Sequence, residues 1–115
     1  MAAPITLYKR FLNNCLSGNV ASIKYLLESN LVDPSEQNNY AIIVSSRDNQ
    51  LDIIKELLKD KRVDASDDSN KAIRLALKNE HYDVVKLLFG IEKVNRKLLK
   101  YQPNIWIHIN EKIVQ

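Results

Sequence analysis

The feature that most constrains this chain of 115 residues is a repeat with a period of 31. Residues 32–35 read Val-Asp-Pro-Ser and residues 63–66 read Val-Asp-Ala-Ser, and the run 51–58 returns with similar chemistry at 82–89. A related apolar segment lies one period earlier, at 23–27. A fixed period of roughly 20 to 50 residues is typical of stacked arrays, in which each unit buries its apolar face only against its neighbours. The sequence therefore predicts a solenoid.

Each period contains two predicted helices. The second helix carries apolar residues at i, i+3 and i+4, which form one stripe of an α-helix. These residues are Ile23, Leu26 and Leu27, then Ile54, Leu57 and Leu58, then Val85, Leu88 and Phe89. The first helix is richer in small residues, around 41–45 and 72–76, and the Asn and Ser residues just before it are expected to cap its free N–H groups. Polar stretches at 33–38 and 64–69 are predicted to be tight turns, so the unit is helix, turn, helix and protruding loop.

Composition fits one small soluble domain without a membrane span. With 45% hydrophobic residues, a chain of this length can bury roughly two-thirds of its unfolded surface. No run of about 18 apolar residues occurs, and residues 1–6 lack the basic start and apolar run of a secretory signal. The single cysteine, Cys15, cannot form an internal disulfide, which agrees with a reducing compartment. We therefore expect an intracellular, cytoplasmic monomer, with the nucleus as a second possible location.

The repeated phrases resemble those of a known family. Gln50 and His81 ahead of the second helices, the apolar runs that follow them, and the Val-Asp pairs at 32–33 and 63–64 are similar to ankyrin repeats over about residues 5–94. The resemblance implies an all-α solenoid in a single domain, 1–115, with repeats at about 5–34, 35–65 and 66–94 and a C-terminal cap at 95–115. The short period and the Asn-x-Ala-Ile phrase are similar to arrays of large DNA viruses and some protists. The function implied is non-enzymatic binding of a partner protein, with no cofactor and no small-molecule substrate.

The chain departs from the family pattern at two places. The family's Thr-Pro-Leu-His phrase reads Tyr-Ala-Ile-Ile at 40–43 and Lys-Ala-Ile-Arg at 71–74, so its polar bonds between units are expected to be missing. The glycine between the paired helices is retained as Gly18 but becomes Asn49 and Glu80. If this turn needs a positive φ, Glu80 costs about 1 kcal/mol there, and Glu80→Gly is expected to raise the melting temperature.

The resemblance also selects partner-binding positions, at the loop tips and the end of the first helix. Carried over position by position, they are Leu16, Ser17, Glu36, Gln37, Asn39, Tyr40, Arg47, Asp48, Asp67, Asp68, Asn70, Lys78 and Asn79. These positions differ between units while the core positions stay apolar, as expected of a recognition surface, although drift of unconstrained surface residues would look the same. Beyond Tyr40 and Tyr8 the strip has few aromatic side chains, which commonly dominate tight interfaces, so a modest interface is predicted.

Charge is divided unequally along the chain. Residues 1–92 hold 12 basic and 13 acidic side chains, whereas residues 93–115 hold 5 and 1. The basic cluster of the tail supports an alternative function, binding of nucleic acid or of another anionic surface, although the nearly neutral repeats argue against nucleic acid. A third alternative is a structural unit that stacks on another copy of itself. The basic cluster of the tail comprises Lys93, Arg96, Lys97 and Lys100.

The C-terminal segment allows two secondary structures. Residues 105–109 alternate as a strand would, but Ile105, Trp106, Ile109 and Ile113 also form a helical stripe shortly after Pro103, which suits a helix start. We expect a degenerate fourth unit that caps the third, with Trp106 buried against it. More weakly, residues 103–109 resemble the opening of an F-box.

Few residues are suited to catalysis or metal binding. The two glycines, Gly18 and Gly90, are too few for a glycine-rich phosphate loop. Cys15 lies on an apolar-rich helix and is expected to be a buried, inert thiol. His81 and His108 have no ligand at metal-binding spacing, and the adjacent carboxylates at 67–68 are expected to be solvated. We also expect a solvated ridge, rather than a phosphate-binding row, for Lys24, Lys55 and Lys86.

Overall fold

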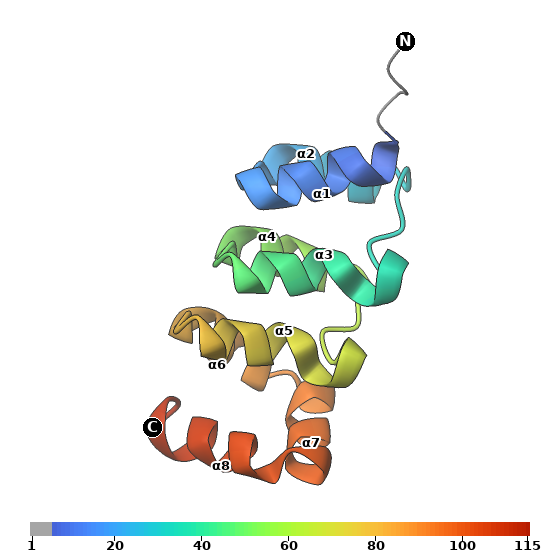
Figure 1. Cartoon of the computed structure of the whole chain (residues 1–115). Helices are drawn as coiled ribbons and strands as arrows, with labels where there is room; N and C mark the ends of the chain where they lie inside the picture. The colour runs from blue at the N-terminus through green and yellow to red at the C-terminus, as the bar shows by residue number, and fades with distance from the viewer. Residues whose placement is uncertain (1–5) are drawn as a thin grey trace.

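A computed structural model describes residues 6–115 and shows an all-helical chain over that range (Figure 1). Residues 1–5, which include the N-terminal stretch considered above and the expected start of the first repeat, lie outside the described residues. The helices are α1 Leu7–Ser17, α2 Val20–Glu28, α3 Glu36–Arg47, α4 Leu51–Leu58, α5 Asp67–Lys78, α6 Tyr82–Phe89, α7 Glu92–Tyr101 and α8 Pro103–Lys112. None of these described helices has the length and apolar character needed to traverse a lipid bilayer.

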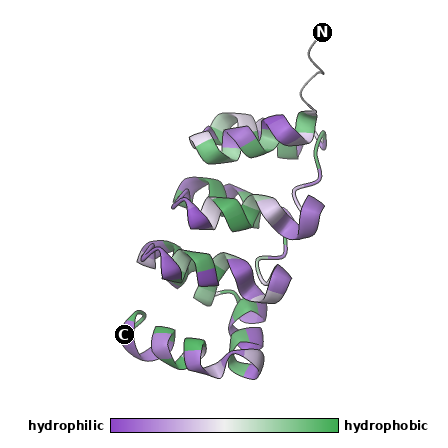
Figure 2. Cartoon of the chain, in the orientation of Figure 1, coloured by the Kyte–Doolittle hydropathy of each residue, from purple (hydrophilic) through white to green (hydrophobic). Residues whose placement is uncertain are grey.

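Three helical hairpins stack in one column, as the period predicts. Helices α1, α3 and α5 lie side by side in one layer and α2, α4 and α6 in a second layer behind it, giving an elongated body of 52 × 26 × 21 Å (Figure 1). Each helix carries an apolar and a polar side (Figure 2). Repeat-equivalent apolar residues fill the core, and Ile23, Ile54 and Val85 are each 0% exposed. The stack is therefore stabilised mainly by burial between neighbouring units.

The turns inside the hairpins share one left-handed geometry. Gly18, Asn49 and Glu80 have φ values of 74°, 58° and 60°. Beside each turn the next backbone N–H bonds five residues back, for example from Gln50 N to the Ser45 carbonyl at 2.8 Å. This is the Schellman arrangement, in which a left-handed residue ends the helix. The turn does need a positive φ, the condition on which the cost of Glu80 depended, and Glu80 occupies a conformation that favours glycine.

Helices α3 and α5 each begin with a left-handed turn, which corrects our expectation of a conventional N-cap. Three consecutive residues have φ between 55° and 62°, at 37–39 in α3 and at 68–70 in α5. Neither helix has a side-chain cap. In α5 the guanidinium of Arg74 donates to the carbonyls of Ser69 and Asp68, at 2.9 and 3.2 Å. Asn and Asp tolerate this region better than most residues, which explains why the turn can form here without glycine.

The protruding loops repeat a second local structure, and the tight turns expected there are confirmed. The Asp33 carboxylate accepts from the backbone N–H and the hydroxyl of Ser35, at 2.9 and 2.6 Å. Asp64 accepts from Ser66 in the same way, at 2.9 and 2.6 Å. Such Asx turns hold each loop by local bonds.

Polar bonds between units exist, but residues other than those of the family phrase make them. Tyr8 Oη donates to the Glu36 carbonyl at 2.9 Å, linking the first unit to the second. Gln50 Nε2 reaches back to the Leu16 carbonyl at 2.8 Å. Asn39 occupies the position of Tyr8 one period later and links the second unit to the third. We expected packing to carry more of the stability in the absence of the family's bonds, and these bonds from other residues add to that packing.

Helices α7 and α8 cover the third hairpin, and α8 removes the strand alternative for residues 105–109. The covering helices begin at Glu92 rather than at residue 95. Trp106 is half-buried, with its ring centroid 6.0 Å from that of Phe89 and its Nε1 donating to Asn95 Oδ1 at 2.9 Å. Ile109 is fully buried. In Figure 1, α8 lies below α5, where the first helix of a fourth unit would stand.

Candidate functional site

The expected partner-binding residues lie at the two ends of the first helices of each hairpin. One group belongs to the loop tips and left-handed turns: Glu36, Gln37, Asn39, Tyr40, Asp67, Asp68 and Asn70. The other group lies where the first helix turns into the second: Leu16, Ser17, Arg47, Asp48, Lys78 and Asn79. At 1.5 Å per residue, the groups are separated by roughly 15 Å along each helix. The structure thus places the residues along two parallel strips and not in one cluster.

Most of these side chains are available to a partner. Ten of the thirteen residues are exposed and Asp67 is half-buried. Tyr40 is 40% exposed and Leu16 is also 40% exposed, so one aromatic and one aliphatic side chain accompany the polar ones. The other aromatic residue considered, Tyr8, is half-buried, and burial together with the nearby Glu36 carboxylate raises its pKa to about 12.

Asn39 and Asn70 differ from the expectation because both are buried, at 4% and 1% exposure. Asn39 Nδ2 donates to Asp67 Oδ2 at 2.8 Å, and Asn39 Oδ1 accepts from the backbone N–H of Asp64 at 2.7 Å. Asn70 Nδ2 donates to the Val94 carbonyl at 3.3 Å. Since their amides are used inside the array, these two residues hold units together and do not line a partner surface.

Arg47 and Asp48 neutralise each other at the turn end of α3. The guanidinium donates to both carboxylate oxygens, at 2.8 and 3.1 Å, and the two side chains are 42% and 37% exposed. The hydrogen bond from Arg47 lowers the pKa of Asp48 below its ordinary value. The pair is therefore an exposed ion pair without net charge, which a partner could meet with hydrogen-bond donors or acceptors.

The acidic tip of α5 is engaged within the protein. Asp67 accepts from Asn39 and, through Oδ1, from the backbone N–H of Asp68 at 2.7 Å. Asp68 lies 3.8 Å from the ammonium of Lys71. Between residues 6 and 115 no three His, Cys, Asp or Glu side chains gather as a metal ion would require. The tip thus offers surface charge and no cation cage.

The family follows from this geometry and from a direct match. A model of ankyrin repeats in three copies matches residues 12–97, which run from within α1 through the third hairpin into α7. The chain belongs to the ankyrin repeat family. No curated protein and no solved structure matches the chain. Ankyrin repeats generally mediate protein–protein interaction and are typically non-enzymatic, so this array is a protein-binding module in that general sense.

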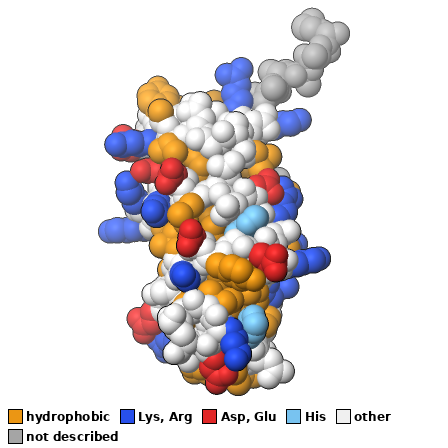
Figure 3. Space-filling view, turned by 90° about the vertical axis from the view of Figure 1, so that its left-hand side faces the viewer, with side chains coloured by type: hydrophobic (Ala, Val, Ile, Leu, Met, Phe, Trp, Pro, Cys, Tyr) orange, Lys and Arg blue, Asp and Glu red, His pale blue; other side chains and the backbone are white. Residues whose placement is uncertain are grey.

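Cys15 and the two histidines of this ankyrin array are poorly placed for catalysis or metal binding. Cys15 is 0% exposed, and burial raises its pKa to about 12, so it remains a thiol at neutral pH. His81 is half-buried and His108 is exposed. Figure 3, a view of the side where the hairpins turn, shows both pale-blue histidines with acidic and basic side chains interspersed around them. This side therefore carries no field of a single sign.

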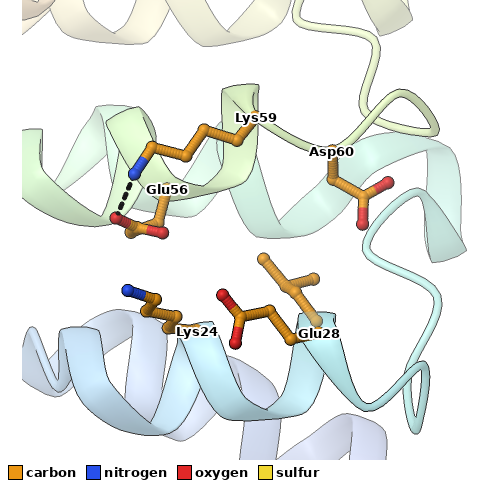
Figure 4. A pocket seen from close by; sticks show the side chains of 6 residues that line it. Lys24, Glu28, Glu56, Lys59 and Asp60 are labelled. Atoms are coloured by element: carbon orange, nitrogen blue, oxygen red, sulfur yellow. Dashed lines mark hydrogen bonds and ion pairs between the residues drawn. The ribbon is translucent and has the colours of Figure 1, made fainter.

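A small hollow on the outer layer of the ankyrin stack, the layer formed by α2, α4 and α6, has mixed charge. It lies between α2 and α4, has a volume of about 140 Å³, and is lined by basic and acidic side chains (Figure 4). Lys59 is paired with Glu56 at 2.8 Å, and Lys24 and Glu28 lie opposite them on α2. Two lysines stand against three carboxylates in this lining, so the hollow is not a basic site for an anion.

The ankyrin array has one charged region that lies beside the loop tips, which sequence reasoning did not place there. Helix α7 presents Lys93, Arg96, Lys97 and Lys100 around two adjoining hollows of about 420 and 350 Å³. The smaller hollow lies between α7 and Ser69 of the α5 turn. The basic cluster was visible in the sequence, but its position beside the loop tips depends on how α7 folds back on the third unit.

Proposed function

We propose that this ankyrin array is a non-enzymatic module that binds a partner protein through the exposed loop tips and first-helix ends. The observation that supports this most directly is the contrast between equivalent positions. Buried positions hardly change from unit to unit, as in Leu26, Leu57 and Leu88, which are all at most 8% exposed. Exposed positions change in size and charge, as in Leu16, Arg47 and Lys78. A rigid scaffold that presents variable side chains loses little conformational entropy on binding.

The proposed partner is a protein of a host cell, and the proposed setting is its cytoplasm or nucleus. The short period is similar to arrays of large DNA viruses and some protists, and this likeness supports the host assignment. The buried thiol of Cys15 suits a reducing compartment. With thirteen positions reduced to eleven by the burial of Asn39 and Asn70, we expect a modest interface.

We propose that the array acts as a monomer, because its first unit has a polar outer face. Arg10 is exposed at the position where Ala41 and Ala72 are buried, and Ser22 stands where Ile53 is buried. A hollow of about 450 Å³ on this face still carries three exposed apolar side chains, but polar groups interrupt them. Light scattering over a concentration series tests this, and a mass that rises with concentration would favour the stacking alternative. The three large apolar side chains exposed in that hollow are Leu7, Tyr25 and Leu31.

The experiment that tests the function is affinity capture from host-cell extract with quantitative mass spectrometry. The test variant combines Arg47→Ala, Asp68→Ala and Lys78→Ala, which removes charge from both strips. The matched control replaces three lysines of the outer layer, Lys24, Lys55 and Lys86, by alanine. We expect specific proteins to be lost at least about ten-fold with the test variant and retained by the control. Equal retention by both variants would reject the proposed surface.

The alternative, binding of nucleic acid or an anionic surface, is favoured by the basic face of α7. Deleting residues 93–115 would not test it cleanly, because Val94, Leu98 and Ile109 of this segment are fully buried. Replacing Lys97 and Lys100 by glutamate leaves the core intact. Steeply salt-dependent DNA binding that this variant abolishes would support the alternative.

A further inference from the structure

Helix α7 takes the place of the protruding loop that would follow the third hairpin, and this position makes it part of the row of loop tips. One period before α7 lie residues 61–70, which form the third unit's loop and left-handed turn. Lys93 Nζ bonds to Asp64 Oδ2 at 2.7 Å, and Lys97 Nζ bonds to Ser66 Oγ at 3.2 Å. These contacts hold α7 against the loop of the third unit, below the end of α5 at which its left-handed turn lies (Figure 1).

The row of tips therefore ends in a hollow between α5 and α7. Its walls are Ser69 and Asn70 on one side and Lys97, Tyr101 and Gln102 on the other, and its volume is about 350 Å³. A second hollow of about 420 Å³ continues along α7 and shares Lys97 and Tyr101 with the first. Volumes in this range accommodate several side chains of a peptide.

Lys97 and Lys100 are the two cations of this surface whose charge is not already matched. Lys93 is paired with Asp64, and Arg96 is paired with Glu92 at 3.1 Å. Within the described part of the chain, neither Lys97 nor Lys100 has a carboxylate within 4.0 Å. Lys97 bonds only a hydroxyl, and Lys100 lies 5.0 Å from the centroid of the Tyr101 ring, which is 65% exposed.

We propose that the two adjoining hollows together bind an acidic segment of the partner protein, a stretch in which Asp or Glu alternates with another residue. The proposal rests on the function proposed above and adds the chemistry of one segment of the partner. Lys97 and Lys100 are three residues apart on one helix, so their side chains start roughly 5–6 Å apart. Alternate side chains of an extended peptide lie on one face roughly 6.6 Å apart, which matches that spacing.

A peptide fits this surface better than a nucleic acid does. The acidic side chains of Asp67 and Asp68 lie at the neighbouring tip and would repel a continuous phosphate backbone that followed the row. Two unmatched lysines also release few counterions, whereas nucleic-acid affinity depends on many phosphate contacts. An acidic stretch of a few residues needs only the two hollows themselves, and its flanks could carry neutral or basic residues past the acidic tips.

The test is fluorescence polarisation at low salt with a labelled seven-residue probe, Gly-Glu-Ala-Glu-Ala-Glu-Gly. We expect the wild type to bind it and the variant Lys97→Gln/Lys100→Gln to bind about ten-fold more weakly. The matched control, Lys55→Gln/Lys86→Gln, loses the same charge on the outer layer and should change affinity less than about two-fold. Thermal melts of all three proteins confirm that each is folded, and the same probe with lysine in place of glutamate should not bind.

Three outcomes would overturn this inference. They are no binding by the wild type, equal weakening in both variants, which would indicate a net-charge effect, and tighter binding of a single-stranded DNA with the same number of charges. The outcome is separable from the capture experiment above. The variant with alanine at Arg47, Asp68 and Lys78 keeps Lys97 and Lys100 and should still bind the probe, so either proposal can fail alone.

Discussion

The two junctions that flank the third ankyrin unit use equivalent residues but are not equally satisfied. At the junction with the second unit, both polar atoms of the Asn39 amide have partners in the next loop. At the junction with the cap, Asn70 donates to Val94, but its buried Oδ1 has no donor among the described residues. The backbone N–H of Asn95, which lies one period after that of Asp64, is bonded to the Ile91 carbonyl instead.

This difference shows how a repeat array can end. A further protruding loop after the third hairpin would offer Asn70 a free backbone N–H, whereas a helix uses its own N–H groups internally. By folding residues 92–101 as α7, the chain gives up one bond at this junction and gains a covering helix with a charged outer side. The cap is therefore expected to be the less tightly coupled end of the third unit, and experiments on its core, on the junction amides and on its ion pair can challenge that expectation.

The largest loss of stability is expected from cavities created in the repeat core and in the cap. Leu57 in α4 and Leu98 in α7 are both 0% exposed, and Leu→Ala at such sites costs about 3 kcal/mol. We expect Leu57→Ala to destabilise the whole stack in one transition. In Leu98→Ala the cap should open first, so the fluorescence of Trp106, the one tryptophan, should change at lower urea than the circular dichroism does.

The neighbouring residue gives a matched control for the cap. Leu99 is 51% exposed, so Leu99→Ala should leave both signals almost unchanged. If fluorescence and circular dichroism change together in Leu98→Ala, the cap and the third unit form one cooperative block, and the proposed difference between the junctions is wrong.

The second largest loss of stability is expected from removing the buried side-chain amides of Asn39 and Asn70. Asn39→Ala leaves the N–H of Asp64 and the carboxylate of Asp67 without their partner, which we expect to cost about 2 kcal/mol in the free energy of unfolding. Asn70→Ala removes one bond and also the unpaired oxygen, so a cost of about 1 kcal/mol is expected. Urea denaturation measures both values.

Alanine at these positions also adopts an unfavourable positive φ. A control variant measures this backbone cost so that it can be subtracted from both results. Asn38 is exposed and has a φ of 57°, so Asn38→Ala reports the backbone cost alone. After that cost is subtracted, a loss for Asn70→Ala as large as that for Asn39→Ala would contradict the difference between the junctions.

The sequence predicted those features of the fold that depend on residues recurring in each repeat. The hairpin order and the core stripes follow from positions that match at a spacing of 31, and so does the equivalence of Glu80 with Gly18. Asn39 and Asn70 were misplaced because a polar residue at a loop edge looks the same whether it faces water or the next loop. Their burial depends on three consecutive left-handed residues, a conformation that no local pattern specifies.

The place of α7 could not be predicted for a different reason. Residues 65–69 are rich in Asp and Ser, which favour turns, whereas the equivalent segment 96–100 contains Arg, Lys and Leu, which favour helix. This change of propensity predicts that the loop is replaced, but the contact of Lys97 with Ser66 is tertiary. The basic cluster was therefore recognised from the sequence, and the hollow beside it was not.

The third experiment compares the turns of the first and last hairpins. Glu80 has a φ of 60° where Gly18 has 74°, so Glu80→Gly should raise the free energy of unfolding by about 1 kcal/mol. Gly18→Ala should lower it by a similar amount, because the new Cβ would also lie 2.9 Å from Gln50 Oε1. Melting temperatures measure both changes. Asn79→Gly, one residue away at a φ of −94°, should be destabilising, and a stabilising result there would show that the gain at Glu80 has another cause.

The smallest effect is expected from the ion pair that joins the cap to the third loop. Burial alone would raise the pKa of Asp64, but the hydrogen bonds from Lys93 and Ser66 outweigh it, so the pKa lies below the ordinary aspartate value of 3.8. A carboxyl group with a lowered pKa stabilises the fold above its ordinary value, and this contribution is lost as the pH falls through the lowered pKa. Asp64→Asn keeps an oxygen for the Ser66 turn but removes the charge. We expect a loss of about 0.5 kcal/mol at neutral pH, because the Lys93 side chain is 62% exposed.

The pH dependence separates this ion pair from a simple change in net charge. The difference between wild type and Asp64→Asn, measured by urea denaturation, should shrink as the pH is lowered below 3.8, because the wild-type carboxyl then becomes neutral as well. Glu111→Gln removes one exposed acidic charge from the cap without breaking an ion pair and should have almost no effect at neutral pH. A difference for Asp64→Asn that stays constant into strongly acidic solution would mean that the lost charge is not what stabilises the junction. The comparison of the junctions would then rest on packing and the Asn39 amide alone.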